Sequence, residues 1–308
     1  MATITTITTT VYPVAPFDFE LTAGYLTYFQ GRYGTDSLTD GVYRRLLDLD
    51  GTLVLASVRS VGTIESPELA VELRGEGLTS SQVGQASERV AWLLGAQQDL
   101  APFYSMAETD STMLAMTQRF HGLHLPHTAS VFEALVLAIL GQQIATNVAR
   151  IIRTLLIETY GPSRTFDGDV YYSFPRPETL AAVPVEELRG KKLSQRKAEY
   201  VQGIALAALE DPTGFEGLHL LTDQEVVQSV TALRGVGNWT AQWLLIRALG
   251  REDALPLGDL ALRRAVSRFY FGDVQLDDKQ VEEFSRRWSP FRTYATVYMF
   301  TAMRTGMG

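Results

Sequence analysis

The fold of this chain is decided by one stretch, Leu233-Arg234-Gly235-Val236-Gly237-Asn238-Trp239-Thr240-Ala241. Two glycines flank one apolar residue, a pattern that suits a tight turn with exposed backbone N–H groups. Helical periodicity runs before and after the turn, so the sequence predicts two helices joined by a glycine hairpin. The first N–H groups of the second helix would attract an anion such as a phosphate group. Taken alone, the pattern also fits a purely structural turn.

One carboxylate follows the hairpin at the distance of a helix. Asp259 stands 22 residues after Gly237, within the run Pro256-Leu257-Gly258-Asp259-Leu260. An aspartate between a glycine and an apolar-periodic segment is typical of a helix N-cap. The helix dipole would keep such a carboxylate ionised. A structural cap and a chemical role for Asp259 are therefore compatible.

The composition is that of a globular protein long enough for two domains. Of the 308 residues, 46% are hydrophobic and 20% are charged, as in ordinary globular chains. No apolar run approaches the ~20 residues of a membrane-spanning helix, and the first 13 residues lack the segments of a secretory signal. We therefore expect a cytoplasmic protein without a membrane partner. The absence of cysteine excludes disulfides, thiolate zinc sites and cysteine-ligated iron–sulfur clusters.

The net charge of −8 resides mostly in the first part of the chain. Residues 1–130 carry 7 basic and 14 acidic side chains, whereas residues 131–308 carry 20 and 21. Within the second part, residues 234–308 hold 11 basic side chains against 8 acidic ones. The overall acidity therefore leaves room for a locally positive surface that binds a polyanion.

Hydrophobic periodicity divides the chain into two parts. Strand-like runs at 6–12, 41–48, 51–58 and 68–74 alternate with helical periodicity at 20–31 and 80–95. From residue 101 onward the periodicity is helical, and the predicted helices span residues 110–120, 130–160, 177–182, 184–188, 194–210, 222–233, 238–249, 259–270, 277–288 and 290–304. The sequence thus predicts an α+β fold: residues 1–112 built on a mostly antiparallel sheet, and residues 113–308 all-α.

Three motifs together resemble the helix-hairpin-helix DNA glycosylase superfamily. They are the hairpin stretch, the Asp259 run continued to Arg263, and Phe132-Glu-Ala-Leu-Val-x-Ala-Ile-Leu-Gly-Gln-Gln143. Two further runs, Trp288-x-Pro-Phe-Arg-x-Tyr294-Ala and Pro16-Phe-Asp-Phe, resemble DNA-3-methyladenine glycosylase II. The resemblance covers almost the whole chain and implies an N-terminal sheet like that of TATA-binding protein.

The resemblance implies base excision from DNA. A monofunctional hydrolase of this type flips out alkylated bases of double-stranded DNA, such as 3-methyladenine and 7-methylguanine, and cuts the N-glycosidic bond to leave an abasic site. Asp259 matches the catalytic aspartate, and a carboxylate can stabilise an oxocarbenium-like sugar and activate water. The resemblance further implies a monomer that requires no cofactor and, in a bacterium, is associated with the nucleoid.

The residue two positions beyond the second glycine separates two chemistries of the superfamily. Members that also cut the DNA backbone resemble one another in carrying a lysine there, as a Schiff-base nucleophile. This chain has Trp239 at that position, so the resemblance implies no lyase activity through it. A glycosylase for oxidised or deaminated bases and a non-catalytic damage-sensing DNA-binding protein are the alternatives.

A flipped base needs a pocket, and the gap it leaves in the duplex needs a wedge. The resemblance implies that the wedge loop (residues 141–144), containing Gln142 and Gln143, fills this gap, with Gln143 in place of an apolar leucine; a polar loop cap is the alternative. The pocket residues that it implies are Tyr25, Trp239, Trp243 and Phe300, for which core packing is the alternative. Gly258 and Leu260 replace an acidic and an aromatic residue, which predicts a smaller, more open pocket.

Further residues are expected to bind DNA phosphates or ions. The candidates for DNA are Gly235, Gly237, Thr240, Lys191, Lys192 and Lys197, although a run of lysines also suits a solvated helix face. The resemblance implies a structural monovalent cation at the backbone carbonyls of Thr231, Leu233 and Val236. The spacing His121-x-x-His124-x-x-His127 is that of a metal site, but its Gly/Pro-containing surroundings predict a surface loop instead.

Overall fold

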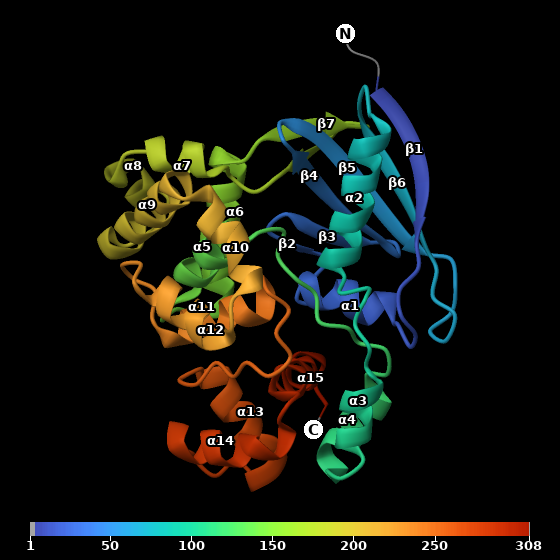
Figure 1. Ribbon diagram of the computed structural model, residues 1–308, viewed down its shortest axis with the longest axis vertical. Helices are drawn as coiled ribbons and strands as arrows, with labels where there is room; N and C mark the ends of the chain where they lie inside the picture. Colours follow the sequence, from blue (N-terminus) through green and yellow to red (C-terminus); the bar gives the residue numbers. More distant parts are fainter. Residues whose placement is uncertain (1–3, 308) are drawn as a thin grey trace.

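The computed structural model describes residues 4–307 of the chain; the ends of the two predicted parts, residues 1–3 and 308, lie outside the described residues. Its N-terminal part is a six-stranded antiparallel sheet with the order β1-β6-β5-β4-β3-β2 (Figure 1). The strands are β1 (Ile4–Val11), β2 (Arg32–Tyr33), β3 (Asp36–Thr39), β4 (Val42–Leu49), β5 (Thr52–Ser60) and β6 (Leu69–Glu76). The four predicted strands correspond to β1, β4, β5 and β6.

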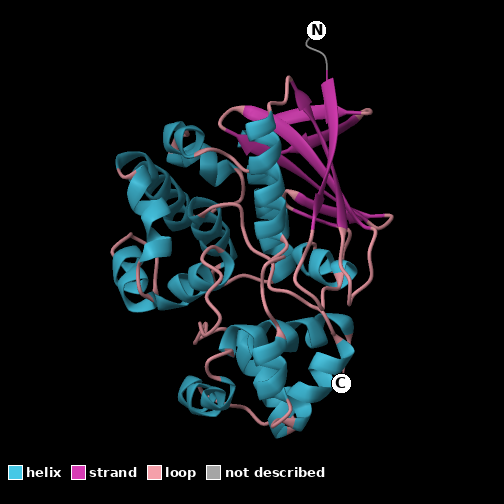
Figure 2. Ribbon diagram, turned by 45° about the vertical axis from the view of Figure 1, so that its right-hand side comes forward, coloured by secondary structure: helices cyan, strands magenta, loops and turns pink. Residues whose placement is uncertain are grey.

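One face of the sheet is covered by two helices, α1 (Phe19–Leu26) and α2 (Ser80–Leu93). Strand β6 alternates buried and half-buried residues, so Leu69, Val71 and Leu73 point to the same face. Together with Val90 of α2 they form the core of this part of the molecule. Figure 2 shows the strands gathered in one half of the molecule, with helices making up the other half.

A short hairpin interrupts the helical half of the chain. Strands β7 (Ser163–Phe166) and β8 (Asp169–Tyr172) pair with each other, and Phe166 packs against Leu46 and Leu55 of the large sheet. The turn is Asp167-Gly168, with φ of +52° and +91°, the conformation that Asp-Gly favours in two-residue hairpins. The α+β fold class is confirmed, but residues 113–308 are not entirely helical.

The remaining helices form two groups. They are α3 (Ala101–Ala107), α4 (Ser111–Arg119), α5 (Val131–Gly141), α6 (Thr146–Tyr160), α7 (Pro177–Ala182), α8 (Val185–Gly190), α9 (Gln195–Glu210), α10 (Pro212–Gly217), α11 (Asp223–Thr231), α12 (Asn238–Arg247), α13 (Leu260–Phe271), α14 (Asp278–Ser285) and α15 (Arg292–Thr305). Helices α5 to α12 share one core, which includes Leu135 and Leu244. Helices α13 to α15 share another with α3 and α4, below the sheet in Figure 1. The boundary predicted at residue 112 falls at the start of α4.

Local sequence signals place most helix starts, and tertiary contacts place one. Thr222 and Glu225 form a reciprocal capping box at α11, and Asp259 is the N-cap of α13, as predicted. The last helix was expected to start at Pro290. It begins instead at Arg292, because Asp253 accepts hydrogen bonds from the backbone N–H (3.2 Å) and the Nε (2.8 Å) of Arg292.

Two of the three histidines, His124 and His127, are buried, so the predicted surface loop is wrong for them, whereas His121 is partly exposed beside Glu65. The two ring nitrogens of His124 lie 2.7 and 2.9 Å from the carbonyl oxygens of Gly95 and Pro16. His127 stacks on Trp92, with ring centroids 4.1 Å apart. Within residues 4–307 no cluster of His, Asp or Glu is suited to holding a metal ion. No helix in the same range is long and apolar enough to cross a membrane.

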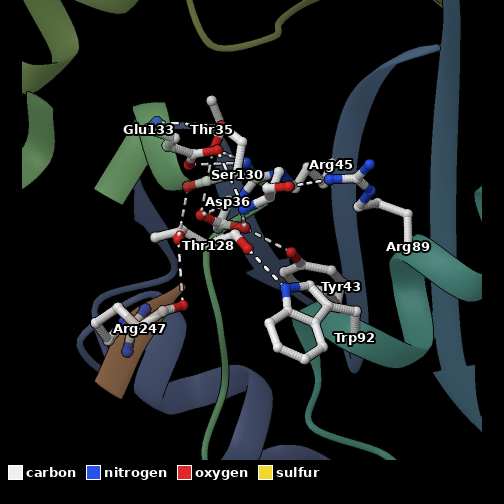
Figure 3. Close-up of polar contacts among 11 residues, drawn as sticks. Thr35, Asp36, Tyr43, Arg45, Arg89, Trp92, Thr128, Ser130, Glu133 and Arg247 are labelled. Atoms are coloured by element: carbon white, nitrogen blue, oxygen red, sulfur yellow. Dashed lines mark hydrogen bonds and ion pairs between the residues drawn. The ribbon is translucent and has the colours of Figure 1, made fainter. Parts of the chain in front are cut away.

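A buried ionic network joins the sheet to the helices (Figure 3). Arg45 of β4 donates to both oxygens of Asp36 (3.0 and 3.2 Å) and to both oxygens of Glu133 on α5 (2.8 and 2.7 Å). The Tyr43 hydroxyl donates to Asp36 as well. The side chains of Arg45 and Glu133 are only 4% and 3% exposed. We call these four residues the Arg45 network; its one guanidinium is shared by its two carboxylates.

Candidate active site

The glycine hairpin forms as the sequence predicts. Gly235 adopts a φ of +91° and a Cβ there would lie 2.3 Å from the Tyr200 ring, so only glycine fits this position. Gly237 is the N-cap of α12 and has no side chain with which to cap it. The first N–H groups of α12 are therefore left without an intrahelical partner. They lie beside the exposed Gly237 and Asn238, where an anion could accept their hydrogen bonds.

The wedge loop is tied to the hairpin by one side chain. The Nε2 of Gln142 donates to the Gly235 carbonyl oxygen at 2.9 Å and to Thr240 Oγ1 at 3.1 Å. The next residue, Gln143, is exposed and has a φ of +53°, which is uncommon for a residue with a Cβ. The structure thus brings the wedge loop and the hairpin together, although 90 residues separate them in the sequence.

Asp259 is held by four N–H groups. Its Oδ1 accepts from the backbone N–H of Ala261 (2.8 Å) and Leu262 (3.2 Å), as an N-cap does. Its Oδ2 accepts from the indole Nε1 of Trp239 (3.0 Å) and of Trp243 (3.3 Å). Within the described part of the chain all four partners are neutral donors. They fix the position of the carboxylate without cancelling its charge.

The residues beside Asp259 leave it accessible. Gly258 has a φ of +85°, a conformation in which an acidic side chain would be strained. Leu260 is 58% exposed, and Asp259 itself is partly exposed. The smaller, more open base pocket that the sequence predicts from Gly258 and Leu260 stays a prediction.

Three of the four predicted pocket aromatics lie together near Asp259. The Trp239 and Trp243 rings meet edge to face, with centroids 6.4 Å apart. Trp243 in turn lies nearly parallel to Phe300 of α15 at 6.0 Å. Trp239 and Trp243 are partly exposed, whereas Phe300 is buried. The two indoles therefore both orient the carboxylate and present aromatic surface beside it.

The fourth aromatic residue is covered by a cation that the sequence analysis missed. Tyr25 is 3% exposed, and the guanidinium of Arg304 lies 4.5 Å from its ring centre and 4.0 Å from that of Tyr28. The face of Tyr25 is therefore not free to stack on a base. Arg304 follows Phe300 by one helical turn, a spacing that puts both on one side of α15. This spacing from Phe300 is the sequence signal from which Arg304 could have been predicted to lie near the pocket aromatics.

The cations around Tyr28 change its acidity. Its burial favours the neutral phenol, but the positive charges of Arg304, Arg153 and Arg247 outweigh burial and lower the pKa of Tyr28 to about 8. Tyr28 also has a φ of +54°, a strained conformation for a bulky residue. Tyr28, next to Arg304, thus combines a lowered pKa with a left-handed backbone conformation.

The predicted phosphate contacts differ in how the structure places them. Lys191 is partly exposed and Lys192 is exposed, and their contact with DNA stays a prediction. The Lys197 ammonium instead donates within the protein, to the carbonyl oxygens of Leu140 (2.9 Å) and Gln142 (2.7 Å). Thr240 is 1% exposed and accepts from Gln142, which leaves no surface for the DNA contact predicted for it. At the predicted cation site, the Leu233 carbonyl oxygen already accepts from the Val236 N–H.

Comparison with known proteins agrees with this geometry. Residues 136–290 match the model of the HhH-GPD superfamily base excision DNA repair proteins. A DNA-3-methyladenine glycosylase of Bacillus subtilis (strain 168) is 29% identical over 205 residues, 67% of this chain and 68% of the relative. A putative DNA-3-methyladenine glycosylase of the same organism, YfjP, is 26% identical over 82% of this chain and 84% of its own.

A solved structure matches almost the whole molecule. The 3-methyladenine DNA-glycosylase from Archaeoglobus fulgidus has a TM-score of 0.85 and 28% identity, covering 97% of this chain and 99% of that one. The family match spans half of this chain and contains the wedge loop, the hairpin and Asp259. The chain therefore belongs to the HhH-GPD superfamily of base excision DNA repair proteins.

Proposed function

We propose that the protein is a monofunctional DNA glycosylase that removes alkylated bases, of the 3-methyladenine and 7-methylguanine type, in base excision repair. The observation that carries this proposal is the Asp259 carboxylate. It is fixed by two indole N–H groups and a helix N-terminus, and it has no cationic partner in the described residues. The names of the relatives, DNA-3-methyladenine glycosylases, support the alkylated base as substrate.

Hydrolysis of the N-glycosidic bond explains why this carboxylate stays uncompensated. As the base leaves, positive charge develops on the deoxyribose, and a fixed negative charge nearby stabilises it. The same carboxylate can orient or deprotonate the attacking water. A purine alkylated at N3 or N7 is already cationic, so it leaves without protonation. One carboxylate is then sufficient for the reaction.

The hairpin and the wedge loop would hold the DNA. The free N–H groups at the start of α12 suit a backbone phosphate, a contact that positions the duplex without reading its sequence. Gln143 would enter the stack where the flipped base has left, and its amide can bond to the orphaned partner base. The flipped base would then lie against the partly exposed rings of Trp239 and Trp243, since aromatic faces attract cations.

The absence of a lysine in the hairpin makes hydrolysis the expected chemistry. Trp239 occupies the position of the Schiff-base lysine and bonds to Asp259. The proposal includes a protein that acts as a monomer and needs no cofactor for the chemical step. It also includes a structural monovalent cation at the carbonyls of Thr231, Leu233 and Val236.

The test is base release from a panel of duplexes, each with one modified base, with the released base identified by mass. We expect release of 3-methyladenine or 7-methylguanine. In Asp259→Asn release should fall by about 10²-fold or more, whereas DNA binding and folding persist because asparagine also caps a helix. Asp277→Asn is the matched control, since Asp277 caps α14 in the same way; its release should be unchanged.

Four outcomes would overturn the proposal or part of it. Equal release by wild-type protein and Asp259→Asn would remove Asp259 from the chemistry, and DNA binding without any release would favour a damage sensor. Borohydride should trap no covalent DNA complex; efficient trapping would reveal an amine nucleophile and a lyase. Release of oxidised bases alone would change the substrate class.

A further inference from the structure

Lys197 is the basic residue of the 191–197 run whose charge points into the protein. It lies in the first turn of α9, and its ammonium donates to the carbonyl oxygens of Leu140 (2.9 Å) and Gln142 (2.7 Å). Its neighbours Lys191 and Lys192 have no hydrogen bond of this kind within the described chain. Of the three lysines in this run, Lys197 therefore uses its charge within the protein, whereas Lys191 and Lys192 present theirs towards solvent.

These two carbonyls belong to the end of α5 and the start of the wedge loop. The last carbonyls of a helix lack intrahelical partners and carry its negative dipole end, which a cation stabilises. Arg153 binds the same helix end through the Leu137 carbonyl oxygen at 2.9 Å. Burial, and then the charge of Arg153, lower the pKa of Lys197. Two partly buried cations, Lys197 and Arg153, therefore bind carbonyl oxygens of the last turns of α5.

The contact with Gln142 fixes the direction in which the chain continues. A carbonyl oxygen shares a rigid peptide plane with the following N–H, so holding the Gln142 oxygen orients the Gln142–Gln143 peptide. The Gln142 side chain is held at its other end by Gly235 and Thr240. Gln142 is therefore clamped from α9 and from the hairpin at once. Gln143, directly after this clamp, adopts its left-handed φ of +53°.

We propose that Lys197 is a positioning residue for base flipping: through the carbonyls of Leu140 and Gln142 it holds the wedge loop so that Gln143 projects into the duplex. This inference rests on the proposed function. Insertion of a side chain into the stack costs a few kcal/mol of unstacking, and a loop that is already ordered adds no further ordering cost. Lys197 therefore promotes the insertion of Gln143 into the base stack and does not itself bind a DNA phosphate.

The inference separates Lys197 from a lysine that binds a phosphate. Each neutralised phosphate contributes about 0.9 to the slope of log affinity against log salt. Removing a phosphate contact therefore lowers that slope by about one and weakens binding evenly. Removing a residue that positions the wedge leaves the slope unchanged and reduces insertion. The two roles thus give opposite results in one pair of measurements.

The experiment compares Lys197→Met with Lys192→Met on a duplex that carries a stable abasic analogue opposite 2-aminopurine. Methionine keeps an unbranched side chain one atom shorter than that of lysine and removes its charge and donors. On this duplex we expect Lys197→Met to keep the salt slope and to lose most of the fluorescence change that reports insertion. On a separate duplex that carries 7-methylguanine, Lys197→Met should release the base about tenfold more slowly. Lys192→Met, whose residue is exposed, should keep the fluorescence change and lower the slope by about one if it meets a phosphate.

A double-mutant cycle with Gln143→Ala tests the route of the effect. If Lys197 acts through Gln143, Lys197→Met should slow base release no further in the Gln143→Ala background. Lys197→Gln, which keeps an N–H donor, should recover part of the fluorescence change and serves if the methionine variant does not fold.

Three results would overturn the inference: a lowered salt slope with normal fluorescence, behaviour identical to wild type, or additive losses with Gln143→Ala. The fluorescence readout needs no base release. A wild-type protein that inserts its wedge but releases no alkylated base would contradict the proposed function alone, and a normal release with unaltered insertion in Lys197→Met would contradict this inference alone.

Discussion

The Arg45 network and the Asp259 site both remove carboxylates from open water, and they treat the negative charge in opposite ways. In the Arg45 network one guanidinium spans Asp36 and Glu133 with four hydrogen bonds. At Asp259 the described residues supply four neutral N–H donors and no cation. The first carboxylates are also fully buried, whereas Asp259 is partly exposed.

The difference separates a structural carboxylate from one available for chemistry. A buried charge is costly unless a charge of opposite sign contacts it, and Arg45 offsets much of the negative charge of Asp36 and Glu133. Neutral donors hold a carboxylate in place and leave its field directed at whatever approaches. A carboxylate held only by neutral donors is therefore available for chemistry. Asp110, which Trp288, Tyr270 and two backbone N–H groups hold, is another of this kind. Asp259 differs from it because its indole partners lie on α12, the helix that follows the glycine hairpin.

The largest effect on stability is expected when the cation of the Arg45 network is removed. Arg45→Met leaves two buried carboxylates without their cation, which should cost about 3–5 kcal/mol of unfolding free energy. Urea unfolding at pH 7 measures it. The matched control is Arg32→Met, because Arg32 and Glu158 form an exposed pair, for which the expected loss is below about 1 kcal/mol. Equal losses in the two variants would show that the network is not structural.

The second largest effect is a loss of unfolding free energy on acidification, which we expect from His127. Burial lowers the pKa of His127 from its ordinary value to about 4. Between about pH 6.5 and 4 the unfolded chain binds a proton that the folded chain does not, so stability falls as the pH falls. The loss relative to pH 7 should reach about 2–3 kcal/mol near pH 4.5.

The measurement is urea unfolding of wild-type protein and His127→Gln at pH 7 and pH 4.5. Glutamine does not titrate, so the stability of the variant should decrease less on acidification by that amount. His124 and His219 are present in both proteins, so their contributions to the loss of stability cancel when the two proteins are compared. A parallel decrease in both proteins would mean that His127 is protonated in the folded state.

The smallest effect is expected from one donor to Asp259. Trp243→Phe keeps an aromatic ring against Phe300 and removes one indole N–H from the carboxylate. A hydrogen bond to a charged group is worth about 1.5–3 kcal/mol, so base release should slow by roughly tenfold or more while DNA affinity is retained. Trp92→Phe removes an indole bond to the Thr128 carbonyl oxygen and should lower stability only. Equal release rates in the two variants would show that the indole bonds do not prepare Asp259.

Much of the fold could be predicted because its signals are local. Four long strands and most helices follow from periodicity, and the caps at Thr222 and Asp259 follow from side chains that bond within three residues of themselves. The β7–β8 hairpin has an Asp-Gly turn, which is a local hairpin signal, but its short strands lie between helices. Its place depends on Phe166 meeting Leu46 and Leu55, a contact that no local pattern encodes.

The candidate site was predictable in part for the same reason. Asp259, Trp239 and Trp243 stand in motifs, although their mutual hydrogen bonds appear only in three dimensions. Arg304 was missed and the free face expected for Tyr25 was wrong, because α15 brings the cation onto a ring almost 280 residues away. The histidine loop was misjudged because its polar residues find carbonyl partners from distant segments.

The sequence by itself determined which residues can turn, cap and carry charge, since glycine conformation, helix capping and the absence of cysteine or a hairpin lysine are properties of single positions. Only the tertiary structure decided which charges are cancelled. Lys197 belongs to a basic run in the sequence, yet its charge is used on the wedge loop. Asp259 is one of 35 acidic residues, and in the described structure one of its oxygens accepts from two indoles of the helix that follows the glycine hairpin. The physical reason is that an electrostatic role depends on neighbours within a few ångströms, and folding selects those neighbours from the whole chain.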